Sequence, residues 1–110
     1  HLMQLIEHTQ FDTVYHEHFS YLSLYTVKHI FENSGLRVFK VEELPTHGGS
    51  LRVYGCHGAD SRNTEESVSS LLHKEQSRGL QQIQTYLSFQ HQANKIKNDL
   101  LNIIKNNKNK

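Results

Sequence analysis

The sequence has little cysteine and no long hydrophobic run, and each scarcity excludes a class of protein. A single cysteine, Cys56, rules out an internal disulfide framework and a cysteine-rich zinc site within this chain. No apolar run approaches the roughly 18 residues of a transmembrane helix, and no signal peptide is visible. We therefore expect no membrane partner and a cytoplasmic location. The 110 residues suffice for one small domain at most.

Charge is also scarce and nearly balanced. The chain has 12 basic and 11 acidic residues and a net charge of +1, which predicts no nucleic-acid partner. Histidine is abundant by contrast, with nine in all. Residues 1–60 hold most aromatics and glycines, whereas residues 61–110 are polar. We expect residues 105–110 to form a frayed tail.

The first half of the chain predicts helices and a β-hairpin. Leu2 and its apolar neighbours have the spacing of the end of an amphipathic helix. Ser23 is a candidate N-cap for a helix over residues 24–34, and Gly35 suits its end. The β-branched and aromatic residues of 36–44 and 51–56 predict two strands paired as an antiparallel hairpin, with a polar loop over residues 55–63.

The second half predicts two helices. Thr64 is a candidate N-cap for a helix that runs toward Gly79. A long helix should follow from Leu80, about 25 residues and roughly 37 Å in length. Its narrow apolar seam, with Tyr86, Ala93 and Leu100 at every seventh position, suits packing on one partner. The small hairpin cannot cover this helix, so self-association is expected.

The segment Tyr15–His18 concentrates groups that bind metals or move protons. In an extended segment, His16 and His18 would share one face and could bind zinc or iron. Such a site would need further ligands, for which the candidates are Asp12, Glu17, His8 and His47. A small histidine-based metal protein is therefore one hypothesis.

Two other interpretations of this segment compete with metal binding. A histidine can exchange protons near neutral pH, Glu17 could orient it, and Tyr15 could donate a hydrogen bond to an oxyanion. Alternatively, the side chains form ordinary hydrogen bonds in a surface loop. The spacing alone leaves all three interpretations open.

The second candidate site is the run Thr46, His47, Gly48, Gly49 and Ser50. It suits a hairpin turn whose glycines supply positive φ, or a backbone nest that approaches a phosphate or sugar. Arg37 and Arg52 could bind phosphate but are more often solvated or paired on a hairpin. Cys56 fits a packed thiol better than a nucleophile.

Two sequence motifs in the first half of the chain together resemble those of a known family. The motifs are YHEHFSY at residues 15–21 and THGGSLRVY at residues 46–54. Residues 11–57 closely resemble the S-adenosylmethionine-dependent sugar C-methyltransferase family, and the similarity continues more loosely to about residue 105. The resemblance implies methyl transfer to a ring carbon of a nucleotide-linked keto-deoxysugar.

The resemblance also implies how the chain is organised. It would be an α+β fragment of an α/β Rossmann-like methyltransferase, with an antiparallel hairpin, flanking helices and a long C-terminal helix. Residues 1–60 would end the methyltransferase-like domain, and residues 61–110 would form connecting helices. The S-adenosylmethionine site would lie outside this chain, as would a zinc-binding N-terminal domain.

Roles for individual residues follow from the same resemblance. It implies that His18 is the general base, that Tyr15 and Glu17 orient substrate or base, and that the turn shapes the substrate side of the pocket through Thr46, His47, Gly48 and Gly49. The chain alone should be inactive, because the cofactor site is missing. A non-enzymatic, self-associating interaction module remains the alternative from a different class.

Overall fold

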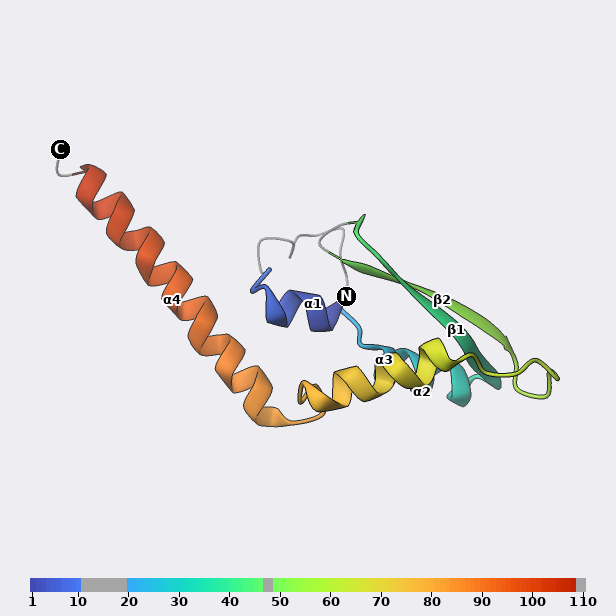
Figure 1. The fold of residues 1–110 in the computed structure, drawn as a ribbon. Coiled ribbons are helices and arrows are strands. Elements are labelled where there is room, and N and C mark those ends of the chain that lie inside the picture. The colour runs from blue at the N-terminus through green and yellow to red at the C-terminus, as the bar shows by residue number, and fades with distance from the viewer. Residues whose placement is uncertain (11–19, 47–48, 109–110) are drawn as a thin grey trace.

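The computed structural model describes residues 1–10, 20–46 and 49–108. Over these residues the chain forms four helices and one two-stranded sheet (Figure 1). In chain order the elements are α1 (Leu2–Glu7), α2 (Leu24–Asn33), β1 (Leu36–Leu44), β2 (Ser50–His57), α3 (Glu66–Ser77) and α4 (Ile83–Lys108).

The boundaries of α2 follow the local sequence signals. The Ser23 hydroxyl accepts a hydrogen bond from the Thr26 amide at 3.3 Å, which satisfies one of the free N–H groups at the start of the helix. Gly35 follows the helix with φ +77°, a conformation that glycine adopts without steric cost. The sequence prediction for this helix is confirmed to within one residue.

The predicted antiparallel hairpin is also confirmed. Its ladder runs from the Leu44–Ser50 pair beside the turn to the Leu36–His57 pair at the far end. The predicted second strand and the predicted polar loop overlapped at Gly55 and Cys56. Both residues lie in β2, which continues through His57, so the loop begins later than expected.

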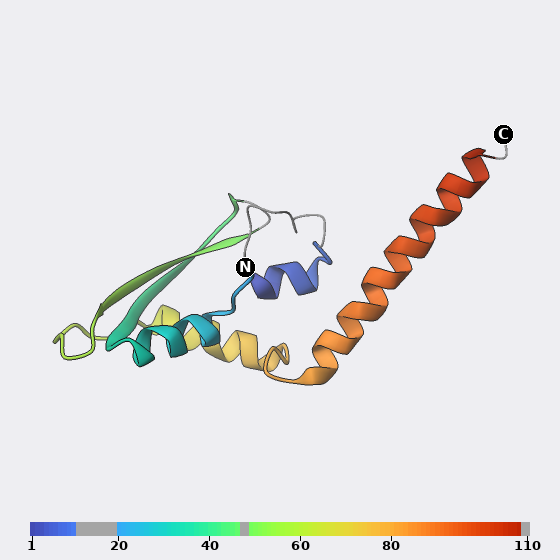
Figure 2. The same cartoon turned by 180° about the vertical axis from the view of Figure 1, so that it is seen from behind.

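The core lies between the hairpin and two helices. Helices α2 and α3 lie side by side on one face of the hairpin, and both contact β1 (Figures 1 and 2). The buried apolar cluster draws on both halves of the chain: Met3, Leu24, Val38, Val41, Val68, Leu71 and Leu80. We refer to the described residues between 1 and 82 as the body.

The expected N-cap of α3 was wrong. Glu65 occupies that position and makes no side-chain cap. Thr64 is instead held by Arg37, whose Nη1 donates to the Thr64 hydroxyl at 2.9 Å. The next amide, that of Glu65, donates to the carbonyl of Phe39 at 2.7 Å. These contacts with β1 fix the chain before the helix begins.

The expected start of the long helix at Leu80 was also wrong. Gly79 ends α3 with φ +73°, and Leu80, only 6% exposed, enters the core before α4 begins at Ile83. The Thr85 hydroxyl donates to the Gly79 carbonyl at 2.7 Å, and the Tyr86 hydroxyl donates to the Leu80 carbonyl. Burial, reinforced by the negative charge of Glu75, raises the pKa of Tyr86.

Helix α4 projects away from the body and contributes no buried residue (Figure 1). It continues through Lys108, so residues 105–108 are helical rather than frayed as expected. Lys105 and Lys108 lie in the last turn, where positive charge favours the helix dipole. The molecule is consequently long, with extents of 67 × 27 × 22 Å.

The α+β class, the hairpin and the long C-terminal helix are therefore all present. The sheet in the described ranges has two strands only. None of the helices in those ranges is both long and apolar enough to cross a lipid bilayer.

Candidate functional site

The two motifs are only partly covered by the structure. Residues 11–19 and 47–48 lie outside the described residues, and they include Tyr15, His16, Glu17, His18, His47 and Gly48. Of the predicted site residues, Thr46 and Gly49 are described. Gln10 and Ser20, the residues that flank 11–19, are described as well.

Thr46 and Ser50 bracket the hairpin turn. The Gly49 amide donates to the Thr46 carbonyl at 3.0 Å. The Ser50 hydroxyl donates to the same carbonyl at 2.8 Å, and the two side-chain hydroxyls lie 3.3 Å apart. These bonds confirm the expected turn and hold its two strand ends at a fixed separation.

Gly49 cannot be replaced by a larger residue without a shift. Its φ is +110°, and an added Cβ would lie 2.8 Å from Cγ of Gln4 on α1. Glycine is therefore needed both for the turn and for the close approach of α1.

A hollow of about 300 Å³ opens on one side of the turn. Ser20 and Tyr21, the last two residues of the first motif, line it together with Leu22. Residues 49–51 of the second motif also line it, and Val27 and Val53 add apolar surface. Described residues of both motifs thus meet at one concave surface.

A second hollow, of about 470 Å³, also borders Gly49. His8 and Gln10 line it from the chain that precedes residue 11, and residues 43–45 line it from the end of β1. Gln10, the last described residue before the segment 11–19, lines this second hollow, whereas Ser20, the first described residue after that segment, lines the first hollow. Both flanking residues therefore line hollows that border Gly49.

The two arginines considered for phosphate binding are engaged within the hairpin and its following loop. Arg37 donates to Thr64 and to the carbonyls of Asp60 and Arg62 at 3.0 and 2.6 Å. Arg52 pairs with Glu42 at 3.5 Å. Neither arginine lines the two hollows beside the turn.

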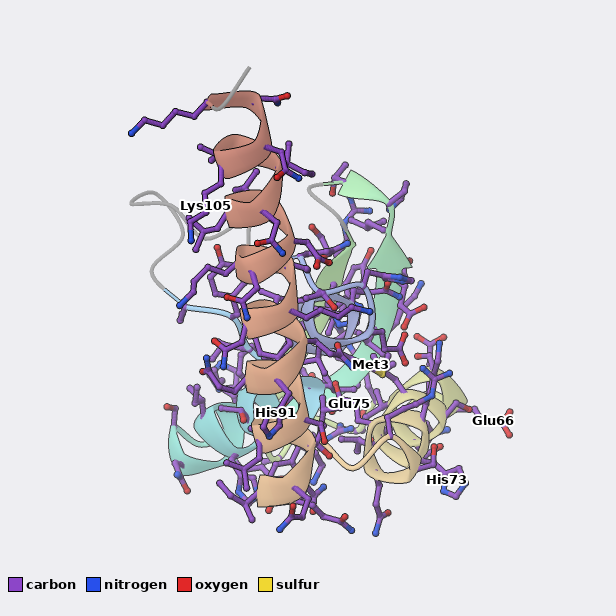
Figure 3. All side chains as sticks on the ribbon, turned by 90° about the vertical axis from the view of Figure 1, so that its left-hand side faces the viewer. Met3, Glu66, His73, Glu75, His91 and Lys105 are labelled. Atoms are coloured by element: carbon purple, nitrogen blue, oxygen red, sulfur yellow. The ribbon has the colours of Figure 1, made fainter. Side chains whose placement is uncertain are left out.

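Glu75 is the most buried charged residue in the described ranges, and the sequence did not predict it. Glu75 is 0% exposed, and its carboxylate accepts hydrogen bonds from the amides of Leu24 and Tyr25 at 2.7 and 3.1 Å. It points into the body, whereas Glu66 of the same helix lies outside (Figure 3). The signal was an acidic residue on the apolar stripe of α3, one turn after Leu71 and two after Val68.

Potential metal ligands are scattered over the described part of the chain. No group of three or more histidine, cysteine, aspartate or glutamate side chains there could hold a metal ion. His8 lines the second hollow, while His16, His18, Asp12, Glu17 and His47 are outside the described residues. Cys56 is a free, half-buried cysteine.

Comparison with known proteins gives two findings. Residues 45–110 match the family model described as the C-methyltransferase C-terminal domain. The chain is also 33% identical over 104 residues to C-methyltransferase NovU of Streptomyces niveus, which covers 94% of this chain and 25% of that protein. The chain thus spans about a quarter of the length of this curated relative.

Proposed function

The chain belongs to the C-methyltransferase family, and from this membership we propose that it supplies the substrate-activating part of a sugar C-methyltransferase. The reaction would transfer a methyl group from S-adenosylmethionine to a ring carbon of a nucleotide-linked keto-deoxysugar. Both motifs that carry the family resemblance support this choice. The proposal concerns a longer polypeptide, since the chain spans a quarter of its relative.

The observation that carries the proposal is the position of the residues that flank the segment 11–19. The described residues before and after this segment line two hollows that share Gly49. Active sites need a concave surface on which groups from distant parts of the chain converge. The flanking residues support a site beside the Thr46–Gly49 turn.

The proposed roles follow from the chemistry of a carbon beside a ketone. Such a carbon becomes nucleophilic only after it loses a proton, so the site needs a base near that carbon. We assign this base to His18, with Glu17 orienting the imidazole. Tyr15 would donate a hydrogen bond to the enolate oxygen, where negative charge develops. The turn residues 46–49 would shape the sugar side of the pocket.

The described residues do not fit S-adenosylmethionine by themselves. They form an antiparallel hairpin, and they lack the parallel strand, glycine-rich turn and helix that bind such cofactors. We propose that the cofactor site, a Rossmann-like sheet and a zinc domain belong to other parts of the longer polypeptide. Residues 1–60 would then end the methyltransferase-like domain, and residues 61–110 would connect it onward.

The assignment of the base is tested in the longer polypeptide by separating proton removal from methyl transfer. The probe is a nucleotide-linked 4-keto-deoxysugar in deuterated water, without S-adenosylmethionine, followed by NMR. His18→Ala should slow exchange of the hydrogen beside the ketone by at least about 100-fold, a typical contribution of a general base. Methyl transfer from labelled S-adenosylmethionine should fall by a similar factor.

The matched control is His73→Ala, which removes an exposed histidine on the outer side of α3 (Figure 3). It should leave exchange and methyl transfer within about threefold of the unaltered enzyme, as expected for a surface substitution. A His18→Ala enzyme that exchanges the hydrogen as fast as the His73→Ala enzyme would remove His18 from the role of base. Tight binding of S-adenosylmethionine to the 110-residue chain would contradict the placement of the cofactor site.

Self-association is a separate proposal, because it depends on α4 rather than on the motif segments. We propose that copies of this chain associate with one another. The exposed apolar residues of α4 support this proposal.

A further inference from the structure

The hollow of about 300 Å³ beside the hairpin turn has an apolar wall that two elements build. Leu51 and Val53 are two residues apart on β2, so their side chains lie on the same face of the strand. Val27 of α2 lines the same hollow. We call Val27, Leu51 and Val53 the apolar wall. All three are half-buried, and the two residues of β2 also pack against the buried core, which holds the wall in place.

The same hollow also presents hydroxyl groups. Ser20 and Ser50, one from each motif, belong to its lining. The Ser50 hydroxyl is fixed by the turn, because it donates to the Thr46 carbonyl at 2.8 Å. A ligand in this hollow thus meets a mostly apolar surface with a few placed polar groups, which is the usual composition of a small-molecule site.

The charges around the hollow limit which part of a nucleotide-linked sugar it can take. No lysine, arginine, aspartate or glutamate side chain lines it within the described ranges. The second hollow differs, since Glu43 and His8 line it. A diphosphate is recognised mainly by cationic side chains, whereas a sugar ring carries no charge. The first hollow therefore suits the sugar.

The apolar wall narrows the choice further, to one group of the sugar. Deoxygenation at the terminal carbon of a hexose leaves a methyl group, which is the most apolar group that such a sugar carries. On the basis of the proposed function, we infer that the hollow seats the methyl group of a 4-keto-6-deoxyhexose. The apolar wall then selects this methyl group over the hydroxymethyl group of the corresponding 6-hydroxy sugar.

Seating the methyl group also positions the rest of the ring. In a 4-keto-6-deoxyhexose the carbon that carries the methyl group is bonded to the ketone carbon. A methyl group held against Val27 and Val53 therefore fixes the ketone, and with it both neighbouring ring carbons, relative to the Thr46–Gly49 turn. Such fixed placement is what brings a reacting carbon within reach of a base.

The selection follows from the cost of burying a hydroxyl group without a partner. A hydroxymethyl group placed against valine and leucine loses its hydrogen bonds to water and gains none from the wall. An apolar pocket discriminates against an added hydroxyl by about 100-fold in kcat/KM. We expect the longer polypeptide to prefer the 6-deoxy sugar over its 6-hydroxy counterpart by a factor of this order.

Two substitutions in the longer polypeptide test the wall. The probes are a nucleotide-linked 4-keto-6-deoxyhexose and the same sugar with a 6-hydroxyl group, and the readout is the ratio of their kcat/KM values for methyl transfer. Val53→Thr keeps the shape of the wall and adds a hydroxyl, so the preference should fall by about tenfold. Val27→Ala, on the other element, widens the hollow and should shift the ratio in the same direction.

The matched controls are Ile30→Thr and Ile30→Ala, which make the same changes one turn after Val27 on α2. Ile30 is 50% exposed and lines neither hollow. Both controls should leave the ratio within about twofold of that of the unaltered enzyme. A ratio measured on one preparation does not depend on the fraction of folded enzyme, so a partly unfolded variant still gives a result.

A failure of this assignment can be told from a failure of the proposed function. A longer polypeptide that methylates neither sugar would overturn the proposed function and the assignment together. One that methylates the 6-deoxy sugar, but whose preference is unchanged in both Val53→Thr and Val27→Ala, would overturn the assignment alone. Equal use of the two sugars by the unaltered enzyme would also overturn it and leave the proposed function standing.

Discussion

At the scale of single residues, Glu75 shows how one buried charge can join two helices. Its carboxylate takes up the free amides of Leu24 and Tyr25 at the start of α2, where the helix dipole also favours negative charge. Ser23 provides a further acceptor to the same turn. The N-terminus of α2 is therefore satisfied partly by its own cap and partly by α3.

Removing this carboxylate should destabilise the body. Glu75→Ala leaves the buried amide of Leu24 and the partly buried amide of Tyr25 without acceptors, and we expect the free energy of unfolding to fall by about 2–4 kcal/mol. Glu75→Gln keeps one acceptor and should cost less. Urea unfolding at one fixed protein concentration measures both changes.

The control for Glu75 is the adjacent exposed residue of the same helix, Gln76. Gln76→Ala should alter the free energy of unfolding by no more than about 0.5 kcal/mol. A Glu75→Ala protein as stable as the Gln76→Ala protein would show that the two hydrogen bonds contribute nothing to the fold.

At the scale of elements, the hairpin and helices α2 and α3 differ from α4 in what stabilises them. The first three bury apolar residues against one another. Helix α4 buries none, so within one copy it depends on its own backbone hydrogen bonds, on the turn contacts of Thr85 and Tyr86, and on a hydrogen bond of 3.0 Å from the Thr9 hydroxyl to Gln92. Isolated helices of such length have marginal stability in water.

The helical content of the chain should therefore depend on concentration. The proposed self-association would pack the exposed apolar residues of α4, and this packing is lost on dilution, so the circular dichroism signal at 222 nm should weaken. Leu100→Lys should show the weaker signal at every concentration. A spectrum that stays constant while the protein passes from dimer to monomer would mean that α4 is stable alone.

At the scale of the whole molecule, the shape is more extended than that of a compact domain. The radius of gyration is 17.9 Å, against about 13 Å for a compact chain of this length. The difference arises because most of α4 extends beyond the body, which it contacts only through its first half (Figure 2). The body and α4 are consequently separable in their contributions to stability.

A shortened chain tests this separation. A protein ending at residue 89 retains every buried core residue and the turn bonds of Thr85 and Tyr86. It should unfold in urea at the same midpoint as the monomeric full chain, and it should not dimerise. If it fails to fold, α4 stabilises the body through contacts that the core does not require.

The sequence by itself determined the elements whose signals are local. Ser23 and Gly35 bound α2, and the turn before Ser50 separates two runs of β-branched and aromatic residues. These signals predict structure because each depends on the conformational preference of one residue or its immediate neighbours. The two motifs likewise pointed to the family from residue identity alone.

Only the tertiary structure decided what depends on distant contacts. Thr64 is a good N-cap residue, yet Arg37 of β1 holds its hydroxyl instead. Glutamate usually lies at the surface, yet the Glu75 carboxylate is buried and accepts hydrogen bonds from the first amides of α2. Likewise, Gln10 and Ser20, which flank the segment 11–19, both line hollows that border Gly49. In each case a partner remote in sequence competes with the local preference, and packing decides which interaction forms.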